Sequence, residues 1–350
     1  MRQLYTSRVG RVVAPGKCDF FERPVYEPQG NQVVIQVRAS ALCGSDLHIF
    51  QGKHPSVTLP CTIGHEFSGD VVATGPDVRR IRIGDRVTVE PCVVCGECEA
   101  CRTGHYGYCE NISFTYRDGN GSMADYVTVK EPSVFLLPDT LSYDAGCLIE
   151  PLAVATHAVR RAAVGLHDRV LVLGAGAIGL LIAAVCHISG AAETTAVDYA
   201  PARLQQALRL GADHTINPAE ESVEAAIQKM TNGRGVDKTF ECVGVEATFL
   251  QAMTALRKDG LATIVGIYEK PNVTIPASVF VTREIHVQGA QGYCWDFPVA
   301  LDLAGKIDLP QLITHTFALN ELQTALETGM NRGSGSIKIV IHPQEKGRSI

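Results

Sequence analysis

Four cysteines lie close together in the run Cys95-Gly-Glu-Cys98-Glu-Ala-Cys101, which is followed after seven further residues by Cys109. In a chain that shows no secretory signal, this spacing predicts a metal site rather than disulfides. Four thiolates complete the tetrahedral shell of a structural zinc and leave no position open for chemistry. An iron–sulfur cluster is the alternative, because four cysteines also hold iron and sulfide. We therefore predict a zinc-held loop here and an open metal site elsewhere.

Ligand types suited to an open zinc site occur in three other segments. Cys43 lies in Ala-Leu-Cys-Gly-Ser-Asp-Leu-His, His65 and Glu66 follow a glycine, and Glu150 begins Glu-Pro-Leu-Ala-Val. A catalytic zinc takes thiolate, imidazole and carboxylate ligands and keeps one position for substrate or water. Taken singly, a lone cysteine is more often core and a His-Glu pair more often a solvated strand edge. Beside a four-cysteine site and a nucleotide motif, they predict a catalytic metal site.

A glycine motif follows an apolar run in Val-Leu-Val-Leu-Gly174-Ala-Gly176-Ala-Ile178-Gly179. The GxGxxG pattern is weak alone, but here it lies between a predicted strand and a predicted helix. The first glycine allows a tight turn, the second lets a pyrophosphate approach the backbone, and the third allows close packing of helix on strand. The helix N-terminus then offers free N–H groups to phosphate. A dinucleotide cofactor is predicted.

Asp198 follows Gly179 by nineteen residues, at the end of the next predicted strand. A carboxylate at this place accepts hydrogen bonds from a ribose 2′-hydroxyl and repels a 2′-phosphate, which favours NAD over NADP. The other interpretation of Asp198 is a cap at the end of the strand. Two roles are expected for Arg203: it packs over the adenine of the cofactor, or its positive charge weakens the preference for NAD over NADP.

Two kinds of pattern divide the chain into two domains of an α/β protein. Residues 1–154 contain short alternating strands with Gly and Pro punctuation, typical of a mostly-β domain. Residues 155–290 alternate apolar strands with helical segments, which predicts a doubly wound parallel sheet covered by helices on both faces. Residues 291–350 are expected to rejoin the first domain. The predicted strands of the second domain are 169–173, 194–198, 214–216, 238–241, 262–265 and 286–288, and its helices include 202–210, 223–231 and 249–256.

Bulk properties exclude several classes of function. The chain has 350 residues, 46% of them apolar and 19% charged, which are globular values. A net charge of −6 argues against nucleic acid or an anionic membrane as partner. Residues 1–5 lead into no apolar signal region, and twelve cysteines fit a reducing cytoplasm. The apolar run 170–188 is long enough to span a bilayer, but its glycines favour a strand followed by a buried helix.

These motifs together make the chain similar to the zinc-containing medium-chain dehydrogenases/reductases. Gly64-His65-Glu66-x2-Gly69-x5-Gly75-x2-Val78 matches the zinc signature of that family, and the resemblance covers essentially the whole chain. It implies a GroES-like, mostly-β catalytic domain and a Rossmann domain. Glu150-Pro-Leu-Ala-Val resembles the branch of sorbitol, butanediol and threonine dehydrogenases, whereas alcohol dehydrogenases of the better-known type have cysteine at that place.

The resemblance also implies roles for residues. Cys43 and His65 match catalytic zinc ligands, and Glu66 and Glu150 match residues that bind zinc or its water in different relatives. Ser45 and His48 match a proton relay; the simpler interpretation of Ser45 is a helix N-cap. Further positions implied for the cofactor are Val243, Val265, Gly266 and Ile267, and for the substrate pocket Phe50, Phe114 and Tyr293, with Tyr116 and Trp295 as other aromatic candidates.

The implied activity is hydride transfer between a secondary alcohol of a polyol, diol or cyclitol and NAD, with two zinc ions per chain. Alternatives are threonine oxidation and a sugar-alcohol-phosphate substrate. Val89-Glu-Pro-Cys92 lacks the histidine usual in threonine dehydrogenases, and Gln291-Gly-Tyr-Cys294 lacks the arginine usual in sorbitol dehydrogenases. A non-catalytic binding protein or a zinc-free quinone reductase would lack ligands that are present here. A homodimer or homotetramer is expected.

Overall fold

The computed structural model describes residues 1–54, 56–268, 270 and 272–345. Contacts divide the chain into unit 1, residues 1–150 with 309–350, and unit 2, residues 151–308. The sequence predicts these boundaries after residues 154 and 290 instead. The last five residues of the predicted segment 291–350 lie outside the described part of the chain. The segment after residue 290 stays with unit 2 because Asp296 Oδ2 lies 2.7 Å from His157 Nδ1 and Asp296 Oδ1 accepts from Arg160.

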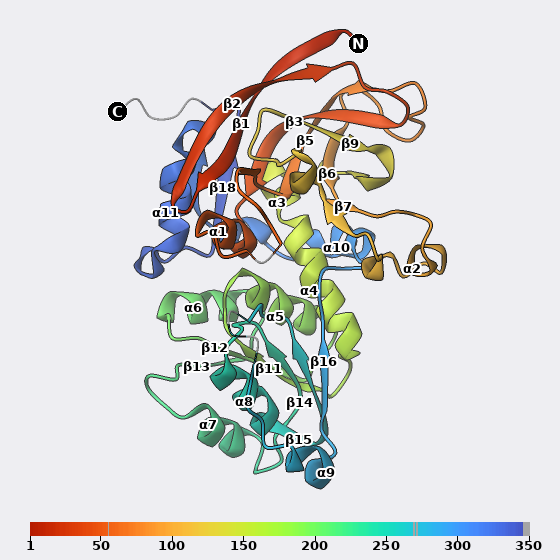
Figure 1. Ribbon diagram of the computed structural model, residues 1–350. Helices are drawn as coiled ribbons and strands as arrows, with labels where there is room; N and C mark the ends of the chain where they lie inside the picture. The colour runs from red at the N-terminus through yellow and green to blue at the C-terminus, as the bar shows by residue number, and fades with distance from the viewer. Residues whose placement is uncertain (55, 269, 271, 346–350) are drawn as a thin grey trace. The chain divides into compact units, whose positions relative to one another are not determined.

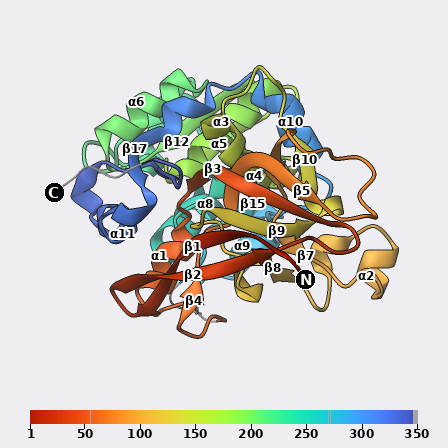
Figure 2. The same ribbon diagram turned by 90° about the horizontal axis from the view of Figure 1, so that it is seen from above.

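Unit 1 is mostly β, as predicted. The long strands β1 (Gln3–Ala14) and β2 (Lys17–Tyr26) form an antiparallel hairpin that β4 (Cys61–Thr62) extends (Figure 2). A seven-stranded sheet holds most of the remaining strands. In spatial order these are β10 (Val134–Leu136), β6 (Arg86–Val89), β5 (Glu66–Thr74), β3 (Gln32–Ala41), β18 (Lys338–His342) and β17 (Ile313–Ala318), with β9 (Tyr126–Lys130) also paired to β3.

The tail therefore returns to the first unit, since β18 pairs antiparallel with β3. Apolar residues of β3, β5, β6 and β9 form the core of this sheet, for example Val33, Ile35, Phe67 and Val87, all fully buried. The short elements that complete unit 1 are α1 (Gly44–Phe50), β7 (Cys92–Val93), α2 (Glu99–Arg102), β8 (Ser113–Phe114), α3 (Tyr143–Cys147) and α11 (Leu322–Met330).

Unit 2 contains a six-stranded parallel sheet in the order β13-β12-β11-β14-β15-β16 (Figure 1). This order matches dinucleotide-binding doubly wound folds, with the reversal between β11 and β14. The strands are β11 (Arg169–Leu173), β12 (Glu193–Val197), β13 (His214–Ile216), β14 (Val236–Glu241), β15 (Leu256–Ile264) and β16 (His286–Gly289). The helices are α4 (Ile149–Ala162, which begins in unit 1), α5 (Ala177–Ile188), α6 (Pro201–Arg209), α7 (Val223–Met230), α8 (Glu246–Ala255), α9 (Ser278–Arg283) and α10 (Phe297–Ala304).

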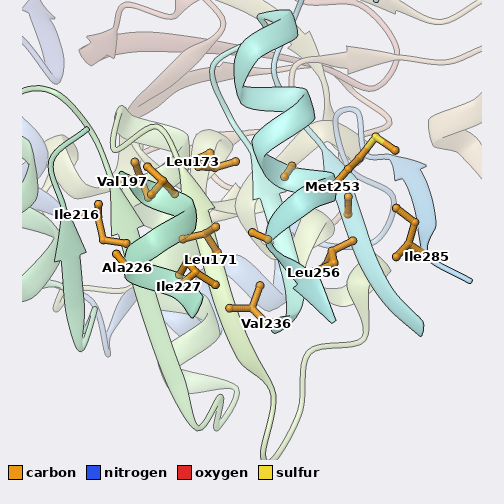
Figure 3. Packing of buried hydrophobic residues seen from close by; sticks show 14 residues of the cluster. Leu171, Leu173, Val197, Ile216, Ala226, Ile227, Val236, Met253, Leu256 and Ile285 are labelled. Carbon is orange, nitrogen blue, oxygen red and sulfur yellow. The ribbon is translucent and has the colours of Figure 1, made fainter. Parts of the chain in front are cut away.

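Both faces of this sheet are buried, as a parallel sheet requires. Leu171 and Leu173 of β11 pack with Ile227 of α7 and Met253 of α8 in one apolar cluster (Figure 3). The alternate residues of β11 face the other side and are equally buried. The apolar run 170–188 is thus a strand and a buried helix, as predicted. No helix in the described part of the chain is both long and apolar enough to cross a membrane.

Candidate active site

Cys43, His65 and Glu66 come together in unit 1, with one ligand atom of each within 4.8 Å of the others. Cys43 directly precedes α1, and Glu66 is the first residue of β5. His65 and Glu66 are only 6% and 1% exposed, whereas Cys43 is partly open to solvent. Thiolate, imidazole and carboxylate donors in this setting suit a zinc ion with one accessible position.

Asp46 holds the two ligand-bearing segments together, a role that the sequence analysis missed. It is fully buried; its Oδ2 accepts the Cys43 N–H at 2.9 Å and its Oδ1 accepts the Gly64 N–H at 3.0 Å. The N-cap of α1 is therefore Cys43, and the alternative of Ser45 as the N-cap is wrong. Gly64 has φ +91°, and a Cβ there would lie 2.6 Å from Ser122 Oγ, so this tight approach requires glycine.

The chemistry of this donor set fits a cation. The buried His65 Nδ1 has no hydrogen-bond partner, and it lies 4.0 Å from Asp46 Oδ1. Burial alone lowers the pKa of His65, but Cys43, Asp46 and Glu150 outweigh burial and raise that pKa well above its usual value. The site thus has an excess of negative charge that a bound metal cation would balance.

Lys338 is a second residue that the sequence analysis missed. Its Nζ lies 2.6 Å from Glu66 Oε1, also donates to Oε2, and lies 3.3 Å from Leu42 O. Lys338 is only 4% exposed and is the first residue of β18, whose next three residues are apolar and buried. A lysine inside such a strand is itself a signal, because lysine is almost never buried without a partner.

Glu150, Ser45 and His48 lie near this group without belonging to it. Glu150 is 5% exposed in the first turn of α4. Burial lowers the pKa of Lys338, but the charges of Glu66, Cys43 and, to a smaller extent, Glu150 outweigh burial and raise it. Ser45 and His48 are three residues apart on α1, hence on one face of the helix, and both are half-buried.

The aromatic candidates separate into two groups. The Phe114 and Tyr116 rings lie 6.2 and 5.6 Å from the His65 ring, measured between centroids. Phe50 is buried in an apolar cluster that also includes Tyr116. Tyr293 belongs to unit 2, where it is 2% exposed and packs edge-on against a phenylalanine, and Trp295 is 62% exposed.

Cys95, Cys98, Cys101 and Cys109 form a second group of donors. The Cys95 sulfur lies 3.9 Å from that of Cys101 and 3.5 Å from that of Cys109. Four thiolates around a zinc at about 2.3 Å lie about 3.8 Å apart, close to these values. Backbone N–H groups lower the pKa of Cys95 to about 6, whereas burial raises the pKa of Cys101 to about 12. None of the twelve cysteines forms a disulfide.

The glycine loop has the geometry that a pyrophosphate needs. Gly174 has φ +94°, and a Cβ at Gly179 would lie 1.8 Å from Gly174 O, so turn and packing both require glycine. A Cβ at Gly176 would meet nothing within 4 Å, which leaves open space in front of the N-terminus of α5. Ile178 lies in the first turn of this helix. The loop thus fits a dinucleotide phosphate.

Asp198 follows β12 and braces this loop. Its Oδ2 accepts the Ala175 N–H and its Oδ1 the Ala200 N–H, both at 2.9 Å. Arg203 Nη1 lies 3.7 Å from Asp198 Oδ2, so the arginine pairs with the carboxylate that was assigned to the ribose. Asp198 therefore fixes the backbone of the glycine loop, and each of its carboxylate oxygens already accepts a hydrogen bond.

Glu241, at the end of β14, organises the other predicted cofactor residues and was missed by the sequence analysis. It is fully buried; Oε1 accepts the Val243 and Gly244 N–H groups at 2.9 Å, and Oε2 accepts the Tyr268 hydroxyl at 2.9 Å. The Gly266 N–H also bonds to the Glu241 carbonyl. Val265, Gly266 and Ile267 follow β15, so these loops lie at the carboxyl ends of strands, where dinucleotides bind in such sheets.

Comparison with known proteins gives two matches to family models. Residues 29–139 match the alcohol dehydrogenase GroES-like domain, and residues 177–306 match the zinc-binding dehydrogenase domain. The first segment holds both groups of metal donors, and the second begins at Ala177, the first residue of α5, directly after Gly174 and Gly176.

Whole-length relatives agree with these matches. Sorbitol dehydrogenase of Bacillus subtilis (strain 168) is 32% identical over 326 residues, 91% of this chain and 92% of its own. D-arabitol-phosphate dehydrogenase of Enterococcus avium is 34% identical over 340 residues, 95% and 97% of the two chains. The solved structure of a zinc-binding dehydrogenase from Sinorhizobium meliloti 1021, bound to NADP, has a TM-score of 0.91 at 29% identity, covering 97% of this chain and 100% of its own.

Proposed function

We propose, because the chain belongs to the zinc-containing medium-chain dehydrogenases/reductases and to their polyol dehydrogenase branch, that it transfers a hydride between a secondary alcohol of a polyol, diol or cyclitol and NAD. The product of oxidation is a ketone. The observation that carries this proposal is the set of thiolate, imidazole and carboxylate donors of Cys43, His65 and Glu66, whose ligand atoms lie within 4.8 Å of one another.

Cys43 and His65 hold the catalytic zinc, with Glu66 or Glu150 as the carboxylate ligand. When bound, zinc supplies Lewis acidity that lowers the pKa of the substrate hydroxyl, and NAD accepts the hydride. Ser45 takes the hydroxyl proton, and His48, on the same face of α1, passes it towards solvent. Cys95, Cys98, Cys101 and Cys109 hold a structural zinc.

The cofactor is held by unit 2. The open space at Gly176 receives the pyrophosphate, and the neighbouring backbone N–H groups of α5 donate to it. Ile178, Val243, Val265, Gly266 and Ile267 complete this site. Asp198 favours NAD over NADP, and its pairing with Arg203 makes the preference moderate, since the arginine offers a positive charge to a 2′-phosphate.

A sugar-alcohol phosphate is the second candidate for the substrate, because one relative of near-equal length is named for such a compound. Threonine is disfavoured by the missing histidine before the four-cysteine segment. Phe50, Phe114 and Tyr293 are the proposed pocket residues. We also propose that the protein is a cytoplasmic homodimer or homotetramer that binds neither nucleic acid nor membrane. Light scattering of the purified protein tests its oligomeric state.

The direct test measures reduced-nicotinamide absorbance with polyols, vicinal diols, cyclitols, sugar phosphates and threonine. It is run with NAD and with NADP, before and after zinc chelation. We expect turnover of one polyol class that chelation abolishes. The absence of turnover with every panel member by zinc-loaded protein would contradict the proposal.

Two substitutions test the residue assignments. Glu150→Ala is expected to remove most turnover but leave NADH binding intact, with the exposed Glu22→Ala as control. Asp198→Ala is expected to reduce the ratio of kcat/KM for NAD to that for NADP, with the exposed Asp302→Ala as control. Wild-type turnover in Glu150→Ala, or an unchanged ratio in Asp198→Ala, would remove that residue from its role.

A further inference from the structure

A pocket of about 400 Å³ lies in unit 1 beside the metal donors. Residues 56–58 and 60–62 line one part of it, and Tyr116 and Arg117 line another. Tyr116 connects the pocket to the donors, because its ring centroid is 5.6 Å from that of His65. Thr62 strengthens this wall, since its hydroxyl donates to Tyr116 O at 2.9 Å. The pocket is therefore linked to the metal donors through the Tyr116 side chain.

Two arginines line this pocket, and they differ in whether a carboxylate pairs with the guanidinium. Arg11 is neutralised by Asp19, whose carboxylate it contacts at 2.7 and 3.3 Å. Arg117 is exposed, and its Nη2 donates to Ser56 Oγ at 3.0 Å. Among the side chains that the structure describes, no carboxylate forms an ion pair with Arg117. The pocket thus has one guanidinium whose charge is available to a ligand.

The guanidinium and the metal donors share one environment. The Arg117 guanidinium carbon is 6.0 Å from the centroid of the Phe114 ring, which itself is 6.2 Å from that of His65. The pKa of His54 is lowered by burial and then by Arg117 and His48, whereas Asp46 raises it. The Phe114 ring therefore lies between the Arg117 guanidinium and the His65 ring.

We propose that Arg117, together with the Ser56 hydroxyl, binds the anionic end of a substrate whose secondary hydroxyl reacts at Cys43, His65 and Glu66. The substrate class is then a polyol with a terminal phosphate or carboxylate. A guanidinium donates two parallel hydrogen bonds to such a group, and a hydroxyl beside it adds a third. This inference rests on the proposed function and specifies the substrate of the same site.

The test compares neutral pentitols and hexitols with their phosphates and with aldonates, using zinc-loaded wild-type protein, Arg117→Gln and Arg117→Lys. We expect the anionic substrates to have the higher kcat/KM. Arg117→Gln should reduce the ratio of anionic to neutral kcat/KM roughly 10- to 100-fold, mainly through KM. Arg117→Lys should recover part of the ratio, and Arg82→Gln, an exposed arginine that does not line the pocket, should leave it unchanged.

Calorimetric titration of the same proteins with a pentitol phosphate, in the presence of NADH, separates binding from turnover. Neutral polyols preferred by wild type, or an equal loss on both substrate kinds in Arg117→Gln, would overturn the inference and leave the proposed function standing. Arg117-dependent binding of the phosphate without turnover of any polyol would support the anion site and overturn the proposed function. A higher rate with phosphates than with aldonates, or the reverse, identifies which anion the pocket takes.

Discussion

Lys338 and Glu66 form a buried ion pair at the metal donors, with the ammonium contacting both carboxylate oxygens. The two side chains are 4% and 1% exposed. Glu66 is thus already partnered by a cation before any metal is considered. A zinc ion bound by Glu66 would therefore share this carboxylate with the Lys338 ammonium.

Lys338→Met is expected to destabilise the zinc-free protein by about 3–5 kcal/mol, because it leaves the Glu66 carboxylate buried and unpaired. The loss should shrink when zinc is bound, since the metal supplies a positive charge. Urea unfolding of both forms measures it. The matched control is the double variant Lys338→Met/Glu66→Gln, which removes both charges and should be more stable than Lys338→Met alone. Equal stability of the two variants would contradict the prediction.

Gly176 and Gly179 are expected to respond differently to alanine. Gly176→Ala adds a Cβ in open space, so the melting temperature should stay nearly unchanged while the Kd for NADH rises about tenfold. Gly179→Ala places a Cβ 1.8 Å from Gly174 O and should cost about 1–3 kcal/mol of stability. Thermal unfolding and NADH fluorescence titration distinguish the two; a large drop in melting temperature for Gly176→Ala would argue against an open cradle.

Cys101→Ser is expected to lower the zinc content from two ions per chain to one, because it removes a ligand of the four-cysteine group. The segment between Cys95 and Cys109 should then become more sensitive to protease. Metal analysis by mass spectrometry measures the loss. Cys18→Ser is the control, since Cys18 belongs to neither donor group, and two zinc ions retained by Cys101→Ser would contradict the assignment.

His342 makes the stability of unit 1 depend on pH. Its Nε2 lies 2.7 Å from Asp144 Oδ1, and this hydrogen bond raises the pKa of His342 despite partial burial. A raised folded pKa gives stability that is fully present below the unfolded value of about 6.5 and is lost as pH rises through the folded pKa. His342→Gln should therefore cost about 0.5–1.5 kcal/mol more at pH 5.5 than at pH 9, measured by urea unfolding. A cost that does not change with pH would exclude this pair as the cause.

Much of the fold was predictable because its determinants are local in the chain. Five of the six strands of unit 2 were predicted within two residues at each end, whereas β15 begins at Leu256, six residues before the predicted start at residue 262. The parallel pairing agrees with the alternation of strands and helices. The Gly174–Gly179 loop and the four cysteines from Cys95 to Cys109 each lie within a short segment of the chain. Their spacing in the sequence was therefore enough to predict that they come together.

Long-range partners were decided only by the tertiary structure. Glu66 and Lys338 are 272 residues apart in sequence and meet only because β18 returns to pair with β3. Asp46 and Glu241 could likewise not be identified from the sequence, because the N–H groups that donate to their carboxylates come together only in the folded chain. Residue types and spacing determined which chemistry this chain can perform. The packing of distant strands decided which charges are paired and which remain available, because electrostatic interactions depend on distance in space and burial rather than on separation in sequence.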